Sequence, residues 1–130
     1  MPCIAGTAGV AIEAFAAPLG DEPVIGKQTF DGFMGTGLER VLRERQVEAI
    51  LIAGLVTSVC VLFTATSAYL RRFVPIVVSD ACADSGNQHE AMLRRYDGLC
   101  FQSVTTAQVR NDLPSVQQLV ETFADRPGLG

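Results

Sequence analysis

The chain has 130 residues, of which 48% are hydrophobic, and a formal net charge of −4. This length suits a single core, so we expect residues 1–130 to form one domain. The Lys and Arg residues are scattered and do not form the basic stripe that a phosphate backbone requires, which argues against a nucleic-acid partner.

The apolar runs and the cysteines exclude further classes. No run approaches the ~20 apolar residues of a membrane-spanning helix, and the start of the chain lacks the basic residues of a signal peptide. Cys3, Cys60, Cys82 and Cys100 form no Cys-x-x-Cys pair and no metal-like spacing with the only histidine, His89. We therefore expect a cytoplasmic, reduced protein with no metal, no other cofactor and no membrane partner.

The first half of the chain predicts few regular elements. Residues 1–23 are rich in Gly, Ala and Pro and predict none. A short strand is expected at Pro23–Lys27, before a glycine-rich passage. The pattern Thr36-x-x-Glu39 is typical of a capping box, so a helix is expected to begin there. Val47–Ala53 is almost continuously apolar, which predicts a strand that is buried on both faces.

The second half predicts an alternation of helices and strands. A helix is expected after Thr57, its candidate N-cap. The later elements are expected to be a strand at Val74–Ser79, a helix at Gln88–Tyr96 that stops at Gly98, a short strand at Leu99–Phe101 and an amphipathic helix after Pro114. Strands that alternate with helices of about ten residues predict an α/β fold with a parallel sheet.

Cys60 is the first candidate for chemistry. It lies in the sequence Gly-Leu-Val-Thr-Ser-Val-Cys-Val (54–61), between the buried strand and the first turn of the next helix. Backbone N–H groups and the helix dipole favour a thiolate at such a position, where α/β enzymes also place nucleophiles. The alternative is a small buried side chain, since free cysteine is among the most buried residue types.

Lys27 is the second candidate, because it ends an apolar strand and faces a glycine-rich turn. It is able to supply a positive charge to a thiolate, although such a lysine also serves as an ordinary surface residue. Phe30 and Phe33 are candidates to line a substrate pocket, with core packing as the alternative. His89 lacks co-ligands and is expected to be structural.

These candidates lie within a series of motifs. The series is Gly-Thr-Ala-Gly (6–9), Pro-Val-Ile-Gly-Lys (23–27), Phe-Asp-Gly-Phe-Met-Gly-Thr-x-Leu (30–38), Gly-x-x-Thr-x-x-Cys-Val-x-x-Thr-Ala (54–65) and Val-Val-Ser-Asp-Ala (77–81). Five segments in this order and at these intervals resemble the isochorismatase-like cysteine hydrolase family. The resemblance runs from about Cys3 to about Val109.

The resemblance implies a three-layer, Rossmann-like α/β fold with a mainly parallel sheet and an Asp–Lys–Cys triad. Within that family, typical substrates are amides, carbamoyl compounds and nicotinamide, while isochorismatase members cleave a vinyl ether. The resemblance makes Cys60 the nucleophile, Lys27 the cation that holds the thiolate, and the backbone N–H groups of Val56 and Cys60 the oxyanion hole. It also implies a cis peptide bond at Leu55–Val56, places Leu55 at the substrate pocket, and gives Asp80 a structural role.

One part of the family pattern has no counterpart here. Relatives open with a strand that ends in the catalytic Asp, whereas this sequence begins just before the lysine strand, so no Asp is assigned as the base by motif. The sheet is therefore expected to lack its usual first strands and to expose an edge. Three explanations are open. A second copy or a partner chain completes the sheet, the segment 1–15 covers the exposed edge, or the sequence is a fragment. We favour a homo-oligomer or a partner chain that completes the sheet, because the chain is rich in apolar residues.

Two classes of function follow from the sequence. The first is cysteine-dependent hydrolysis of a small amide, carbamoyl or related substrate. The second is a non-catalytic binding or assembly subunit, or a non-hydrolytic step such as a cyclisation.

Overall fold

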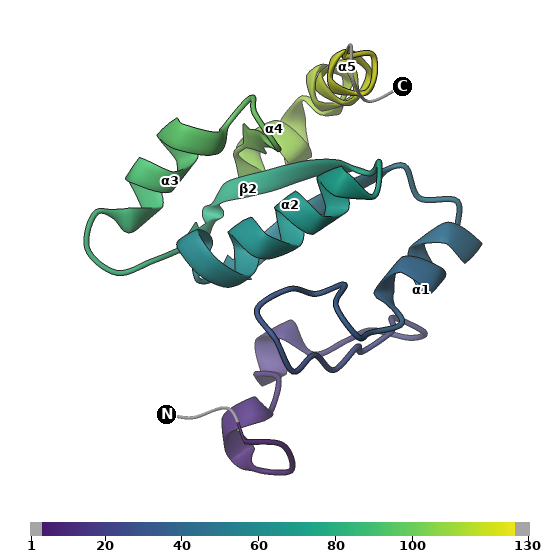
Figure 1. The fold of residues 1–130 in the computed structure, drawn as a ribbon, viewed down its shortest axis with the longest axis vertical. Helices are drawn as coiled ribbons and strands as arrows, with labels where there is room; N and C mark the ends of the chain where they lie inside the picture. Colours follow the sequence, from purple (N-terminus) through teal and green to yellow (C-terminus); the bar gives the residue numbers. More distant parts are fainter. Residues whose placement is uncertain (1–3, 127–130) are drawn as a thin grey trace.

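A computed structural model describes residues 4–126 and shows a parallel sheet with helices on both faces (Figure 1). The strands, in sheet order, are β1 (Ala49–Leu55), β2 (Val74–Ala83) and β3 (Gln102–Val104). The helices are α1 (Leu38–Glu44), α2 (Leu62–Leu70), α3 (Gln88–Tyr96), α4 (Thr106–Asn111) and α5 (Leu113–Ala124). The predicted α/β class with a parallel sheet is confirmed.

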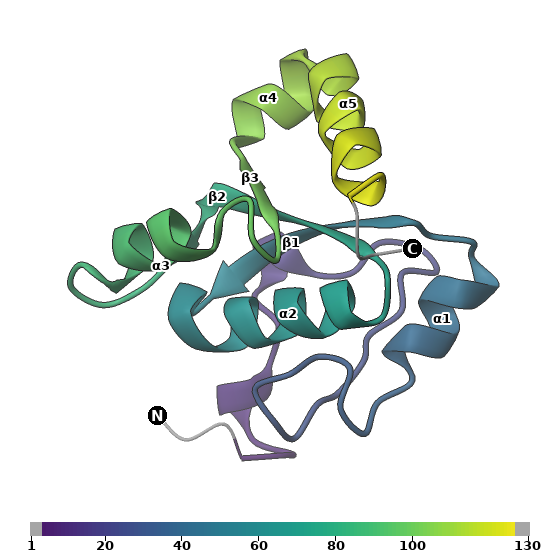
Figure 2. The ribbon, with the colours of Figure 1, turned by 45° about the horizontal axis from the view of Figure 1, so that its top comes forward.

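The central strand β2 is buried on both faces over Val74–Val78, which explains why these five residues are all apolar. Val77 points to one face and packs in a cluster with Ala65 of α2. Ile76 points to the other face and packs in a cluster with Val116 and Phe123 of α5. Figure 2 shows α2 on one side of the sheet and α4 and α5 on the other. The predicted three-layer arrangement is therefore present.

The segment before α1 is held against α2. The Phe33 ring stacks on the Phe73 ring with centroids 5.9 Å apart, and both belong to a small buried cluster. The backbone N–H of Gly32 donates to Thr64 Oγ1 of α2 at 2.9 Å. These contacts bring the passage that follows Lys27 next to the helix that follows Cys60.

The expected helix at Gln88–Tyr96 is present with the same bounds, and Gly98 follows it with a positive φ of 76°. The strand expected at Val74–Ser79 is present and extends to Ala83. The amphipathic helix after Asp112 buries Val116 and Phe123, as its pattern predicts.

Several element predictions were wrong. Thr57 is not an N-cap, because it lies inside the turn that Val56 precedes. Residues 23–27 form no strand, because no described strand lies beside them to share a hydrogen-bond ladder. Thr36 is not the N-cap of α1, because Gly37 holds that position and the helix begins at Leu38. The Thr36 hydroxyl donates to Gly32 O at 2.6 Å and accepts from the Leu38 N–H at 3.2 Å. The last strand lies at Gln102–Val104 and not at 99–101, while Phe101 forms only an isolated bridge.

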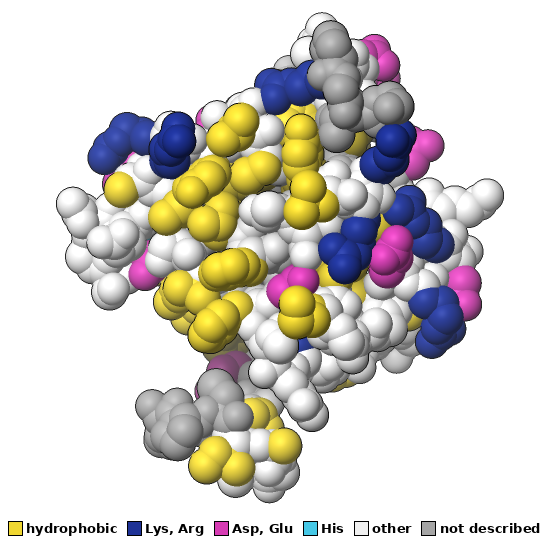
Figure 3. Space-filling model, viewed as in Figure 1, with side chains coloured by type: hydrophobic (Ala, Val, Ile, Leu, Met, Phe, Trp, Pro, Cys, Tyr) yellow, Lys and Arg dark blue, Asp and Glu magenta, His cyan; other side chains and the backbone are white. Residues whose placement is uncertain are grey.

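One edge of the sheet is open and apolar surface lies near it. β1 pairs only with β2 among the described strands, and its Leu51 and Leu55 side chains are exposed, so the predicted burial of this strand on both faces is wrong. Phe63 and Leu70 of α2 are also exposed. Figure 3 shows apolar side chains gathered over the middle of the face on which α2 lies in Figure 1. Within residues 4–126, no helix is long and apolar enough to cross a membrane.

Candidate active site

Cys60 lies on a single π-helical turn, Thr57–Val61, between β1 and α2. The preceding Leu55–Val56 peptide bond is cis, as the resemblance implied. The turn closes with a bond from the backbone N–H of Val61 to Val56 O at 3.2 Å. The chain thus leaves the carboxyl end of a parallel strand and turns at once into a helix, with Cys60 half-buried in that turn.

Lys27, the only lysine of the sequence, is the residue that reaches this cysteine. Its Nζ atom lies 3.9 Å from Cys60 Sγ and donates to Thr29 O at 2.7 Å. The second contact folds the lysine side chain over its own loop and directs the ammonium group to the sulfur. The structure therefore brings together the two residues that the sequence singled out first.

Both residues border a pocket of about 300 Å³ at the carboxyl end of β1. Its lining is formed by Lys27, Gly32, Ile52, Ala53, Gly54, Leu55, Cys60, Val61 and Thr64. Lys27 is the one charged side chain in this lining. The pocket is therefore small, largely apolar and positively charged at the sulfur.

Of the three other residues predicted to line the substrate pocket, only Leu55 does so. Leu55 lines the pocket and is 69% exposed. Phe30 is 61% exposed, and its ring lies 6.1 Å from that of Phe63, outside the pocket lining. Phe33 is only 4% exposed and is packed against Phe73, so it is a core residue that does not face the pocket. The Val56 amide precedes the Thr57–Val61 turn, and the Cys60 amide lies within it.

No carboxylate of residues 4–126 forms an ion pair with Lys27. Asp31, the nearest acidic residue in sequence, has both oxygens engaged, by the N–H of Phe33 at 2.9 Å and by Ser67 Oγ at 2.6 Å. Asp80 likewise accepts from the backbone and side chain of Thr106, and these hydrogen bonds lower the pKa of its carboxyl group. Within residues 4–126, the site therefore has a cysteine and a cation without an acidic partner.

A polar cluster lies behind the turn that carries Cys60. Thr57 Oγ1 lies 2.8 Å from His89 Nδ1, and the backbone N–H of Ser58 donates to Asp84 Oδ2 at 2.6 Å. The hydrogen bonds from Ser58 lower the pKa of the Asp84 carboxyl group. Sequence reasoning expected a structural His89 and did not single out Asp84, because nothing in a polar loop indicates which of its side chains turns back to the strand edge.

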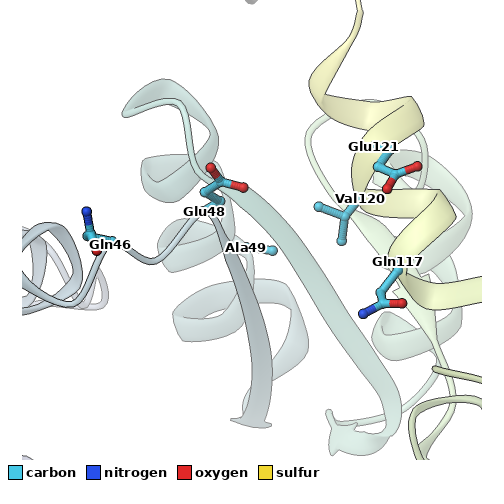
Figure 4. Close-up of a pocket in the computed structure, with 6 residues that line it drawn as sticks. All are labelled: Gln46, Glu48, Ala49, Gln117, Val120 and Glu121. Atoms are coloured by element: carbon cyan, nitrogen blue, oxygen red, sulfur yellow. The ribbon is translucent and has the colours of Figure 1, made fainter. Parts of the chain in front are cut away.

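A larger hollow of about 500 Å³ lies elsewhere, between the start of β1 and α5 (Figure 4). It is lined by Gln46, Glu48, Ala49, Gln117, Val120 and Glu121. It contains none of the residues that the sequence predicted for the site. In the part of the chain that the structure describes, no three His, Cys, Asp or Glu side chains are grouped to hold a metal ion.

Comparison with known proteins agrees with this geometry. The Isochorismatase domain family matches residues 2–109. The uncharacterized isochorismatase family protein YaaI of Bacillus subtilis is 31% identical over 93 residues, which are 71% of this chain and 51% of that protein. This chain thus spans about half the length of that curated relative.

Solved structures of similar proteins also superpose on this chain. An isochorismatase-like hydrolase from Alkaliphilus metalliredigens superposes with a TM-score of 0.79 at 28% identity, over 83% of this chain and 60% of that one. N-carbamoylsarcosine amidase from Thermoplasma acidophilum superposes with a TM-score of 0.69 at 28% identity, over 77% of this chain and 57% of that one. The fold, the site at the end of β1 and the match over residues 2–109 together show that the chain belongs to the isochorismatase family.

Proposed function

We propose that this chain supplies the nucleophile Cys60 and the cation Lys27 of a cysteine hydrolase that acts on a small amide or carbamoyl compound. The observation that carries the proposal is the 3.9 Å contact between Lys27 Nζ and Cys60 Sγ inside a pocket at the end of a parallel strand. An ammonium group at this distance stabilises negative charge on sulfur, the form in which cysteine attacks. The amide or carbamoyl class is supported by the similarity to N-carbamoylsarcosine amidase.

The chemistry follows from the position of the sulfur. Cys60 Sγ bonds to the carbonyl carbon, and the carbonyl electron pair moves to oxygen, where the backbone N–H groups of Val56 and Cys60 serve as donors. When the tetrahedral intermediate collapses, the C–N bond breaks and the nitrogen leaves with a proton. Water then adds to the thioester carbon and releases the acid and the Cys60 sulfur. Each half of this reaction needs a group that carries a proton.

The proton carrier has to come from outside the described residues, because no carboxylate of residues 4–126 pairs with Lys27. The open edge of β1 supports the same view. A polypeptide strand from a second copy or a partner chain, laid along β1, would cover Leu51 and Leu55 and would end beside the pocket that Cys60 lines. The substrate itself is proposed to be small, because the pocket holds about 300 Å³ and its lining is largely apolar.

The lack of a carboxylate paired with Lys27 in the part of the chain that the structure describes also favours a second candidate function. A chain that kept the fold and the pocket but lost the proton carrier would act as a non-catalytic binding or assembly subunit. In that protein Cys60 would react with alkylating reagents no faster than a thiol in an unfolded chain. The two candidates therefore differ in a property that is measurable without knowledge of the substrate.

The proposed function is tested by ammonia release from a panel of primary amides and N-carbamoyl amino acids. Cys60→Ala is expected to abolish turnover, while Cys100→Ala, which removes a buried thiol, is expected to retain it. Iodoacetamide labelling, mapped by mass spectrometry, should modify Cys60 before Cys82 and Cys100, since burial raises the pKa of both those thiols. Full turnover by Cys60→Ala would contradict the proposed function. Absence of turnover together with slow labelling of Cys60 would favour the binding subunit.

A further inference from the structure

The first two residues of the turn that carries Cys60 are held by side chains from the loop after β2 and from α3. Thr57 Oγ1 contacts His89 Nδ1, in the first turn of α3, at 2.8 Å. The Ser58 N–H donates to Asp84 Oδ2, in the loop after β2, at 2.6 Å. More than twenty residues separate each pair in sequence, so only the parallel pairing of β1 with β2 brings them together.

The contact of Thr57 with His89 is the more sheltered of the two. Thr57 is 1% exposed, the one polar side chain in the buried core of the described residues. A buried hydroxyl without a hydrogen-bond partner is destabilising, so the Thr57 hydroxyl depends on His89. The second oxygen of Asp84 accepts from the N–H of Ser85 at 2.8 Å, which fixes the carboxylate in its loop. A lowered pKa keeps Asp84 charged at neutral pH, and a charged acceptor makes a stronger hydrogen bond.

The place of the two contacts within the turn gives them a consequence for Cys60. Thr57 and Ser58 open the π-helical turn, and Cys60 follows within it before α2 begins at Leu62. A π-helical turn is a rare geometry that persists where the surroundings hold it. The direction of the Cys60 side chain toward Lys27 therefore depends on where the first two residues of the turn are held.

We infer that His89 and Asp84 are positioning residues, which hold the Cys60 turn through Thr57 and Ser58 so that the sulfur faces Lys27 and the pocket. This inference rests on the proposed function for its catalytic meaning. Neither residue lines the pocket or contacts the sulfur, so neither is a catalytic residue. Their effect passes entirely through the backbone of the turn.

The test uses two variants that remove one contact each, Thr57→Val and Asp84→Ala. The probe is iodoacetamide at neutral pH, and the readout is the rate at which Cys60 is labelled in the folded protein. Each variant is expected to label Cys60 about fivefold more slowly, the factor that corresponds to one hydrogen bond of about 1 kcal/mol. On any amide that the wild type turns over, kcat should fall with KM nearly unchanged, because the pocket lining is intact.

Conservative variants separate positioning from a general loss of stability. Thr57→Ser keeps the hydroxyl and should label Cys60 at nearly the wild-type rate. Asp84→Asn keeps an uncharged acceptor for the Ser58 N–H and should label Cys60 faster than Asp84→Ala. The side-chain amide of His89→Asn is able to take the place of Nδ1, so Cys60 should be labelled faster in this variant than in His89→Ala. Ser79→Ala is the matched control, because it removes the 3.0 Å bond to Val104 O between β2 and β3 without touching the turn.

The outcomes distinguish this inference from the proposed function. Wild-type labelling rates in folded Thr57→Val and Asp84→Ala would overturn the inference, as would an equal slowing in Ser79→Ala. Loss of turnover in Cys60→Ala together with either result would leave the proposed function in place. Full turnover in Cys60→Ala, with slowed labelling in Thr57→Val, would instead overturn the proposed function and keep the positioning role.

Discussion

Lys27 and Cys60 lie 33 positions apart in the chain, yet the Lys27 ammonium nitrogen lies 3.9 Å from the Cys60 sulfur. The two are joined through contacts that neither residue makes itself. The Gly32–Thr64 hydrogen bond and the Phe33–Phe73 stack hold the loop after Lys27 against α2, the helix that continues from Cys60. The charge beside the sulfur is thus a product of loop packing and not of a strand, since residues 23–27 form none.

The first prediction concerns this charge. Lys27→Met keeps the length and the apolar part of the side chain and removes the ammonium group. Lys27 is exposed, so its charge and a negative charge on the Cys60 sulfur, 3.9 Å away, attract each other through water. This attraction is about 1 kcal/mol, which corresponds to about fivefold in rate. Iodoacetamide should label Cys60 about fivefold more slowly in this variant, as measured by mass spectrometry.

Two further variants show whether charge is the cause. Lys27→Arg keeps a positive charge and should lose less than Lys27→Met. Arg45→Met removes an exposed positive charge just after α1, away from the pocket lining, and should leave the labelling rate unchanged. Equal rates in the wild type and Lys27→Met would show that the 3.9 Å contact has no electrostatic effect on the thiol.

The sequence predicted the elements that depend on local pattern and missed those that depend on distant partners. The helix at Gln88–Tyr96 was predicted to the residue, because its start and its glycine stop are both local signals. Thr36 had the spacing of a cap, but its hydroxyl donates to Gly32 O. No local signal predicts this bond, which forms only when the glycine-rich loop closes on itself.

The same distinction applies to the candidate site. Cys60 and Lys27 were identifiable because their motifs surround them in sequence, and their contact follows from the fold. Phe30 and Phe33 look alike in sequence, yet Phe33 alone is buried, because α2 and Phe73 lie beneath it. Asp84 had no local signal at all, since its partner Ser58 belongs to another strand end.

The second prediction concerns pH and Asp80, which joins the end of β2 to the start of α4. Both carboxylate oxygens accept from Thr106 at 2.7 Å, and these bonds lower the Asp80 pKa from its ordinary value of 3.8. A carboxyl group with a lower pKa in the folded state contributes stability above the pKa of the unfolded state. That contribution is lost as the pH falls from about 3.8 through the lower folded value.

Asp80→Asn should therefore lower the urea midpoint at pH 7, and its difference from the wild type should shrink as the pH falls below 4. Thr106→Ser, which keeps both donors, is the matched control and should follow the wild-type curve. A difference between wild type and Asp80→Asn that is the same at pH 7 and pH 3 would contradict this account. Unfolding followed by circular dichroism gives the midpoints.

The third prediction concerns the open edge of β1. Leu51 is 51% exposed on a strand that pairs only with β2 among the described strands. If a second copy covers this edge, the chain is a dimer or larger in solution, and Leu51→Lys should weaken it, because lysine on an edge strand disfavours strand addition. Loss of one buried leucine corresponds to about 1.5 kcal/mol, or about a tenfold higher dissociation constant.

Leu113→Lys is a close control for this substitution, since Leu113 is also 51% exposed but lies at the start of α5, away from the edge. Light scattering over a dilution series should show dissociation at higher concentration for Leu51→Lys than for the wild type and for Leu113→Lys. A wild-type chain that is monomeric at every concentration would exclude a second copy as the cover of β1. In that case a second copy would not supply a carboxylate to Lys27 either, because the open edge of β1, the exposed Leu55 and Lys27, which forms no ion pair within residues 4–126, all border the same pocket.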